Sequence, residues 1–188
     1  MFLVAVVVLA ALAVPLAGGR LGALVEVRLR HVWAIFAALG LEIAAMELPG
    51  LPEGFRAALM VAAYPVGAVF LAANWHLPGM PLVALGAALN LLAISVNGGV
   101  MPASPSALAG AGLEFEAGFQ NSTTLADPQL AFLGDVFYLP ASWPLSNVFS
   151  VGDVLIGVGL VWGLHRVGGS RLVPRWTGNP AAPPPGPP

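Results

Sequence analysis

The 188-residue sequence contains no cysteine and no lysine, and only 9% of its residues are charged. The absence of cysteine excludes disulfide bonds, thiolate nucleophiles and cysteine-ligated metal sites, and the absence of lysine excludes Schiff-base catalysis. The three histidines, His31, His76 and His165, lack the spacing of metal ligands, so we expect no metal and no cofactor. The net charge of -2 is uninformative about partners, and we expect no nucleic acid among them.

Apolar residues are abundant instead, at 58% of the sequence, and the mean hydropathy is +0.86. Both values are well above those of soluble proteins and predict an integral membrane protein. A helix needs roughly 17 to 25 apolar residues to cross a membrane. Five runs approach or reach that length: 2–17, 32–48, 57–75, 80–96 and 151–167. Backbone groups in lipid must be bonded within the protein, so the predicted fold class is an all-α bundle of five transmembrane helices.

The arginines lie almost entirely on one side of this predicted topology. Six of the seven follow the first or the last run, and only Arg56 falls on the opposite side. The positive-inside rule therefore places the N-terminus outside and the C-terminus in the cytoplasm of a bacterial inner membrane. No basic residue precedes the first apolar run, so we expect that run to be a membrane span rather than a cleaved signal peptide.

The predicted topology divides the chain into a five-helix transmembrane domain, residues 1–167, and a disordered proline-rich cytoplasmic tail, residues 168–188. The domain includes a long outer loop, residues 97–150, which we expect to fold back on the membrane surface. Ser104 before Pro105 and Asp127 before Pro128 each combine an N-cap residue with proline at the first helical position, and they predict two short helices in this loop.

Polar and small residues within the spans point to contacts between helices. Asn90 and Ser95 in the fourth span are predicted to form hydrogen bonds with neighbouring helices. Gly159 and Gly163 in the fifth span have the spacing of small residues at helix interfaces. This spacing indicates close packing, either within one chain or between two copies.

Two carboxylates are candidates for chemistry within the spans. Glu42 lies about 9 Å before Leu48 along the second predicted helix, in the outer half of the membrane. It is either a proton or ion site, or a protonated acid that bonds a neighbouring helix. Asp153 lies one turn inside the outer end of the fifth span, and Ser150 precedes it at capping-box spacing. Capping is therefore its predicted main role, with a functional role possible in addition.

Three motifs in the second half of the chain occur in a familiar order. They are NGGVMP at 97–102, LGDVFYLP at 133–140 and VFSVGD at 148–153. In this order and at these separations they resemble the domain of unknown function 5317 family of small bacterial membrane proteins. The resemblance implies an uncharacterised multi-pass membrane protein, and it implies no mechanism.

A second resemblance concerns catalysis. Residues 143–159 are similar to the last membrane segment of lipoprotein signal peptidases, and Phe149 and Asp153 match the motif that carries a catalytic aspartate there. The motif that carries the second aspartate of that family is missing, since neither Asp127 nor Asp135 is followed by arginine. Asp135 is the remaining candidate for a second carboxylate, so an enzyme would use Asp135 and Asp153 as its catalytic pair.

We therefore predict an outer-side binding site rather than a catalytic one. Its residues are Glu42, Asn97, Asp135 and Asp153, beneath the outer loop. The expected ligand is a small cation, a proton or a lipid headgroup, and the expected surroundings are the lipid bilayer. The alternatives are a membrane-embedded aspartic hydrolase and an accessory subunit that packs against a larger membrane complex.

Overall fold

The computed structural model describes residues 2–113, 122–174 and 176. Five long helices account for most of this part of the chain: α1 (Phe2–Leu16), α3 (Trp33–Glu47), α4 (Glu53–Ala73), α5 (Met80–Val96) and α7 (Val151–Val167). Each coincides with one of the five predicted apolar runs, so the mainly helical class is confirmed. Two shorter helices are α2 (Gly22–Val25) and α6 (Pro105–Ala111).

Helix α4 is the segment that supports association with a membrane. With 21 residues it is the one helix among the described residues that is both long and apolar enough to cross a bilayer. Helices α1 and α5 are also apolar, but they have 15 and 17 residues.

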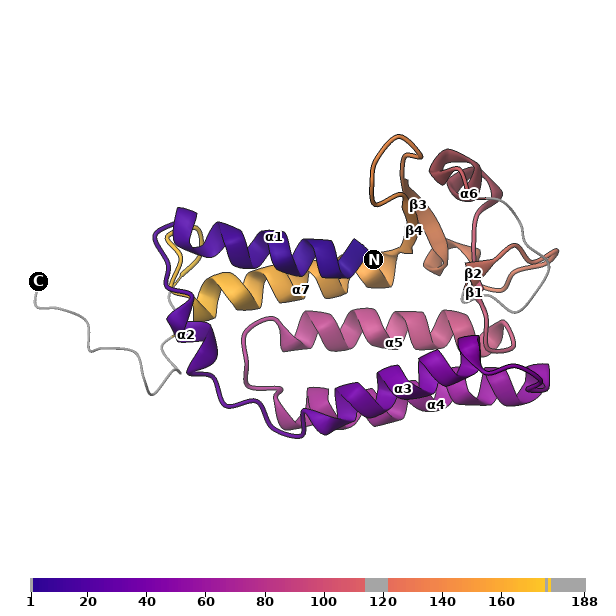
Figure 1. Ribbon diagram of the computed structural model, residues 1–188, viewed down its shortest axis with the longest axis horizontal. Coiled ribbons are helices and arrows are strands. Elements are labelled where there is room, and N and C mark those ends of the chain that lie inside the picture. Colours follow the sequence, from indigo (N-terminus) through magenta and orange to yellow (C-terminus); the bar gives the residue numbers. More distant parts are fainter. Residues whose placement is uncertain (1, 114–121, 175, 177–188) are drawn as a thin grey trace, which may run out of the picture.

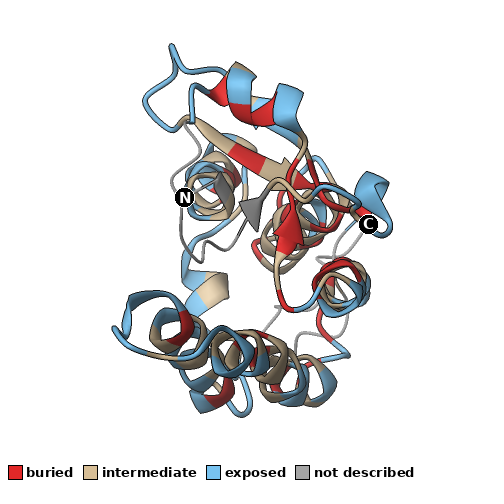
Figure 2. Ribbon diagram, turned by 90° about the vertical axis from the view of Figure 1, so that its right-hand side faces the viewer, coloured by how far each residue is buried: buried red, intermediate tan, exposed pale blue. Residues whose placement is uncertain are grey.

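The long helices form an open arc (Figures 1 and 2). Helix α1 packs on α7, α7 on α5, α5 on α4, and α4 on α3. The helices at the two ends of the arc, α1 and α3, do not form one of these packed pairs. The interior of the arc is therefore bordered by all five long helices, and α1 and α3 are not closely packed against each other.

Glycines bring the backbones of α5 and α7 into direct contact. A Cβ atom placed on Gly86 would lie 2.4 Å from the backbone oxygen of Gly152, and one on Gly159 would lie 2.7 Å from that of Gly79. The turn before α5 also approaches Gly163 through the backbone of Pro78. The small-residue spacing of Gly159 and Gly163 thus serves packing within one chain, which was one of its two predicted roles.

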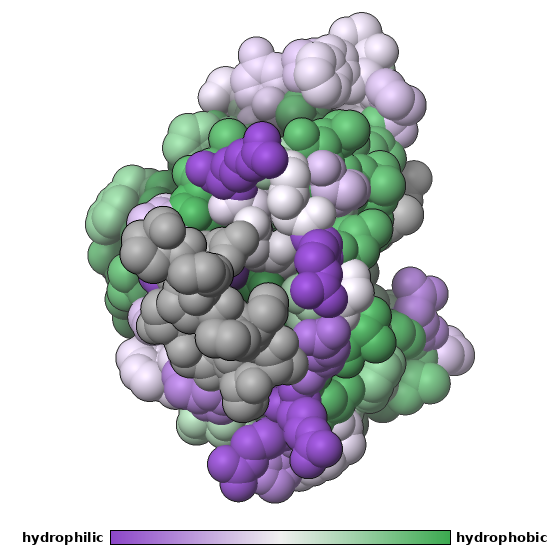
Figure 3. Space-filling model, turned by 90° about the vertical axis from the view of Figure 1, so that its left-hand side faces the viewer, coloured by the Kyte–Doolittle hydropathy of each residue, from purple (hydrophilic) through white to green (hydrophobic). Residues whose placement is uncertain are grey.

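The arginines of the described residues, apart from Arg56, gather around one end of the bundle. The chain after α1 meets the chain after α7 there: the Arg20 amide bonds to the Gly168 carbonyl at 2.8 Å, and the Arg171 amide to the Ala17 carbonyl at 3.0 Å. Figure 3 looks onto this face, which we call the arginine end, and shows hydrophilic residues across it with hydrophobic residues toward the sides. Of the predicted tail, Arg175 and residues 177–188 lie outside the described part.

Arg56 lies at the opposite end of the bundle, where it has a structural task. Its guanidinium group donates hydrogen bonds to backbone carbonyls at the end of α3, among them those of Ala45 and, at 2.7 Å, Leu48. The last carbonyls of a helix have no partner within the helix, and a cation there interacts favourably with the helix dipole. Arg56 therefore stabilises the α3–α4 turn.

The long loop at this second end, which we call the loop end, contains two small sheets. Strand β1 (Met101–Pro102) pairs in parallel with β2 (Ser122–Thr123), and β3 (Asp135–Leu139) pairs antiparallel with β4 (Asn147–Ser150). Strand β4 continues directly into α7, and Phe137 stacks on Phe149 across the β3–β4 pair. The second sheet is thereby attached to the bundle through α7.

One of the two predicted loop helices is present, and the prediction of the other is wrong. Helix α6 begins at Pro105 after Ser104, as expected. After Asp127 and Pro128, however, the chain forms only a short 3-10 turn, η1 (Ala131–Leu133), and then strand β3. The residue before the turn, Leu130, is left-handed with φ 50°, and the residues of β3 are rich in the β-branched and aromatic types that favour strands.

The close α5–α7 contact gives a first prediction. The substitution Gly86→Ala should lower the free energy of unfolding by about 1–3 kcal/mol, because the new methyl group would overlap the Gly152 carbonyl. The matched control is Gly40→Ala in α3, where an added Cβ meets no atom within 4 Å, and its expected change is within about 0.5 kcal/mol. Unfolding by SDS titration in mixed micelles measures both. Equal stabilities would contradict the tight contact.

Candidate functional site

The interior of the arc holds a cavity of about 1090 Å³. Its lining comes from all five long helices, from β1, β3 and β4, from α6, and from Leu113 shortly after α6. Seven of the lining residues have polar or ionisable side chains other than thioethers: Glu42, Glu47, Tyr64, Asn90, Asp135, Asn147 and Asp153. No arginine or histidine is among the lining residues. The cavity is therefore a site with only acidic ionisable groups, apart from the phenol of Tyr64.

Asp153 is held at the start of α7 by a complete capping box, as the sequence predicted. The Ser150 hydroxyl accepts a hydrogen bond from the Asp153 amide at 3.0 Å, and Oδ2 of Asp153 accepts one from the Ser150 amide, also at 3.0 Å. Both partners belong to the first turn of the helix, where orphan amides need acceptors. The carboxylate is thus fixed in position at the wall of the cavity.

Asn90 extends this arrangement from α7 to α5. Its Nδ2 donates to Oδ1 of Asp153 at 3.0 Å, and its Oδ1 accepts from the Ser150 hydroxyl at 2.8 Å. Both Asn90 and Ser150 are buried, so these bonds satisfy groups that water cannot reach. The predicted bonding of Asn90 to a neighbouring helix is confirmed, and both oxygens of Asp153 accept hydrogen bonds.

The other two predicted carboxylates reach the same cavity from different elements. Asp135 begins strand β3, is only 4% exposed, and stands opposite Ser150 in the β3–β4 ladder. Glu42 lies half-buried on α3. Tyr64 on α4 lies close enough to Glu42, Asp135 and Asp153 for a coulombic interaction with each. Three carboxyl groups that are far apart in the sequence therefore surround one region of the cavity.

Asn97, the fourth predicted site residue, is not among the residues that line the cavity. Its side chain donates to the Ala93 carbonyl at 2.7 Å and to the Gln129 carbonyl at 2.8 Å, and it accepts from the Gln129 amide at 2.8 Å. The side chain thus joins the end of α5 to the loop before η1. Asn97 therefore positions the loop.

The sequence interpretation missed three polar residues of the cavity, namely Glu47, Tyr64 and Asn147. Glu47 and Asn147 lie at the ends of elements, where polar residues are common and carry no special signal. Tyr64 did have a signal, because it is a hydroxyl in the middle of an apolar run. The direction of that side chain, however, depends on the packing of α4 against α3.

Metal coordination finds no support in this arrangement. Among the residues that the structure describes, no three or more His, Asp or Glu side chains are grouped so that they could hold a metal ion.

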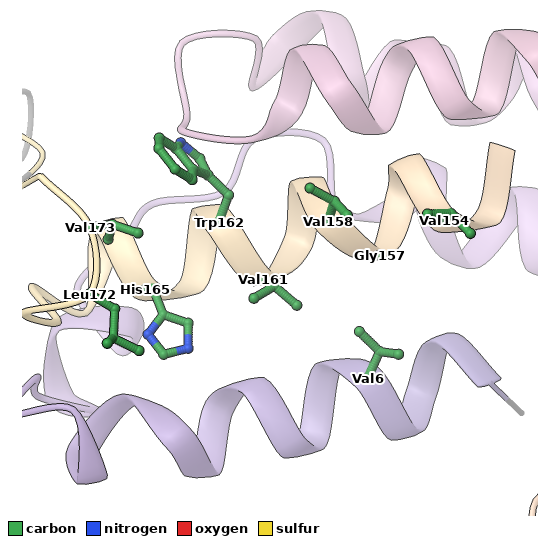
Figure 4. A pocket seen from close by; sticks show the side chains of 9 residues that line it. All are labelled: Val6, Val154, Gly157, Val158, Val161, Trp162, His165, Leu172 and Val173. Atoms are coloured by element: carbon green, nitrogen blue, oxygen red, sulfur yellow. The ribbon is translucent and has the colours of Figure 1, made fainter. Parts of the chain in front are cut away.

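A second pocket, of about 390 Å³, lies between α1 and α7 (Figure 4). Its lining is aliphatic except for Trp162 and His165, and His165 points from α7 toward α1. The Nδ1 atom of His165 is buried and has no hydrogen-bond partner among the described residues. This pocket contains no carboxylate, so the large cavity is the better candidate for a binding site.

Comparison with known proteins agrees with the resemblance seen in the sequence. Residues 26–164 match the model of a family of unknown function, DUF5317. One curated relative, an uncharacterized protein of Thermotoga maritima, is 33% identical over 92 residues, which cover 49% of this chain and 54% of the relative. The chain thus spans about half the length of this relative. No solved structure matches the chain.

The two serines that precede helices in the loop provide a second prediction. Ser150→Ala should lower the free energy of unfolding by about 1–2 kcal/mol, because it removes the cap of α7 and leaves buried Asn90 Oδ1 without its donor. Ser104→Ala is the matched control, since the Ser104 side chain makes no capping bond to α6. Denaturant titration of both variants tests the difference. If Ser104→Ala is equally destabilising, the network is not the cause.

Proposed function

This chain belongs to the DUF5317 family, whose function is unknown, and we propose that it is a multi-pass protein of the bacterial inner membrane that binds a positively charged organic ligand. The observation that carries this proposal is the central cavity, which is lined by four carboxyl groups and by no basic residue.

The surface of the bundle supports five membrane spans. Each long helix exposes large apolar side chains that no other part of the chain covers, and examples from the five are Leu9 at 66%, Phe36 at 69%, Phe55 at 54%, Leu85 at 50% and Val158 at 51%. Exposed apolar area of this extent on several neighbouring helices is the expected surface of a protein in lipid. Helices of 15–17 residues are roughly 23–26 Å long, so the bilayer would be thinned around the shorter ones.

The arginines support the proposed orientation. Arg20, Arg28 and Arg30 lie in the connection between α1 and α3, and Arg166 and Arg171 lie at the end of α7. Cytoplasmic loops of membrane proteins carry an excess of arginine and lysine. The arginine end therefore faces the cytoplasm in this proposal, and the loop end and the carboxylates lie toward the outside.

The size and charge of the cavity favour an organic cation over a bare ion. Ligand sites for small molecules usually have volumes of about 300–1,000 Å³, and the cavity, at about 1090 Å³, is slightly larger than that range. Carboxylates in a region of low dielectric attract a cation more strongly than they would in water. An amine or a quaternary ammonium group beside Glu42 and Asp135 would balance their charge.

A hydrolase is the second candidate function. It is favoured by the pairing of Asp135 opposite Ser150, which brings Asp135 to the head of α7, where Asp153 lies. Binding is preferred because both oxygens of Asp153 already accept hydrogen bonds from Ser150 and Asn90, an arrangement suited to holding the helix start. An accessory subunit is less well supported, since packing against a larger complex does not require a cavity.

The proposal predicts charge-dependent binding in the cavity. Butylamine at millimolar concentration should raise the thermal midpoint of the detergent-solubilised protein, and Glu42→Gln combined with Asp135→Asn should reduce that rise by at least half. The reason is that the amides keep the shape of the carboxyl groups and lose their charge. Glu53→Gln is the matched control, because Glu53 lies in the first turn of α4 and does not line the cavity. An unchanged shift in the double variant would sink the proposed site.

The orientation can be tested because the natural chain has no cysteine. Single substitutions Leu145→Cys at the loop end and Leu172→Cys at the arginine end place one thiol at each exposed position. In intact cells, a membrane-impermeant maleimide should label Leu145→Cys, and it should label Leu172→Cys only after the cells are opened. The reverse pattern would invert the proposed topology.

A further inference from the structure

The polar residues of the central cavity lie in one part of its length. On α3, α4, α5 and α7, the lining residues that lie nearer the arginine end than Glu42, Tyr64, Asn90 and Asp153 are all apolar, whereas the loop-end part of the lining contains both polar and apolar residues (Figure 1). On α5, for example, Asn90 lies near the loop end, while Val83 and Met80 lie toward the arginine end. The same order holds on α4, from Tyr64 to Phe70 and Leu71. The cavity therefore has an acidic half and an apolar half.

The apolar half is long enough for a hydrocarbon chain. From Asn90 to Met80, the lining of α5 extends by ten residues, or roughly 15 Å at the helical rise. A hydrophilic cation has no apolar group that could fill this part of the cavity. An apolar chain would bury its surface there with a gain of about 25 cal/mol per Å² relative to water.

The wall of the cavity is open on the side between α1 and α3. Val4 on α1 and Ile35 and Leu39 on α3 all line the cavity, yet they are 62%, 41% and 48% exposed. A residue that both lines a cavity and is largely exposed lies at the rim of an opening. The rim is apolar, and it lies at the two ends of the helix arc, which do not pack against each other (Figure 2). In a bilayer such an opening faces the lipid chains.

The charge of the lining determines which polar group a ligand of the cavity can carry. Phosphate groups are recognised in proteins by arginine, by lysine or by helix N-termini with free amides. The cavity offers no basic residue, and the N-terminus of α7 is already capped by the carboxylate of Asp153. Four carboxyl groups would repel a phosphate, whereas their negative charge would attract an ammonium group.

From these observations we propose that the ligand is a membrane amphiphile with a hydrocarbon chain and an amine at its polar end, and that it enters the cavity sideways between α1 and α3. This inference rests on the proposed function, because it uses the same cavity. The amine lies among Glu42, Asp135 and Asp153, and the chain lies along α5 and α4 toward the arginine end. The opening allows the chain to pass from the bilayer without crossing water.

The test compares amines that differ only in chain length, in protein reconstituted into nanodiscs. Radiolabelled dodecylamine and radiolabelled butylamine are titrated by scintillation proximity, with empty nanodiscs subtracted. The free aqueous concentration that half-saturates the protein should be at least tenfold lower for dodecylamine than for butylamine, because the buried chain adds apolar contact. Dodecyl phosphate, with the same chain and the opposite charge, should not compete with dodecylamine.

The route is tested by narrowing the opening. Val4→Trp should slow the association of dodecylamine at least tenfold in a scintillation time course, because it narrows the opening, and it should slow the association of butylamine less, because the smaller amine needs less space. Val8→Trp is the matched control on the same helix, since Val8 is 51% exposed and does not line the cavity. Leu39→Trp closes the opening from α3 and replaces Val4→Trp if that variant does not fold.

The outcomes separate this inference from the proposed function. If butylamine binds and responds to Glu42→Gln combined with Asp135→Asn, but neither Val4→Trp nor Leu39→Trp slows the association of dodecylamine, the cavity binds cations and the lateral route is overturned. If the two amines half-saturate the protein at equal free aqueous concentrations, the proposal that the ligand is an amphiphile is overturned. If neither amine binds, the proposed function fails together with this inference. Competition by dodecyl phosphate would overturn the charge selection in both.

Discussion

The rest of the structure depends on the direct backbone contact between α5 and α7. Glycines on both helices allow this contact, since a side chain at Gly86 or Gly159 would overlap the backbone of the facing helix. At this separation Asn90 can reach both Ser150 and Asp153, so the two helices are also held by hydrogen bonds. Helix α1 then packs on the outside of α7, and α4 with α3 on the outside of α5. The open arc and its cavity follow from this central pair.

The long loop between α5 and α7 completes the cavity as well as connecting two helices. Strand β4 runs directly into α7, so the register of the β3–β4 pair is tied to the capped start of that helix. This register sets Asp135 opposite Ser150 and leaves it buried at the cavity wall. Asn97 fixes the loop from the other side, by bonding the end of α5 to Gln129. The position of the buried acid therefore depends on pairing between segments far apart in the chain.

Local signals predicted the helices well and the loop poorly. The apolar runs matched the long helices because each run is uniform and is bounded by residues that end helices. The capping box of Ser150 and Asp153 was predictable for the same reason, since its partners are three residues apart. Strands β3 and β4 were not predicted. The short apolar stretch after Asp127 and Pro128, which contains β3, is compatible with either a helix or a strand. Only pairing between the two strands decides between them.

The sequence by itself determined the helical class, the family, the arginine asymmetry and the acidic character of the loop between α5 and α7, because these depend on composition and on residues near one another in the chain. Only the tertiary structure decided that Glu42, Asp135 and Asp153 line one cavity, that Tyr64 and Glu47 join them, and that Asn97 does not. The physical reason is that these side chains come from four different elements. Their convergence is set by the contacts that glycines permit between helices and by the register of a strand pair, and neither is encoded in a local stretch.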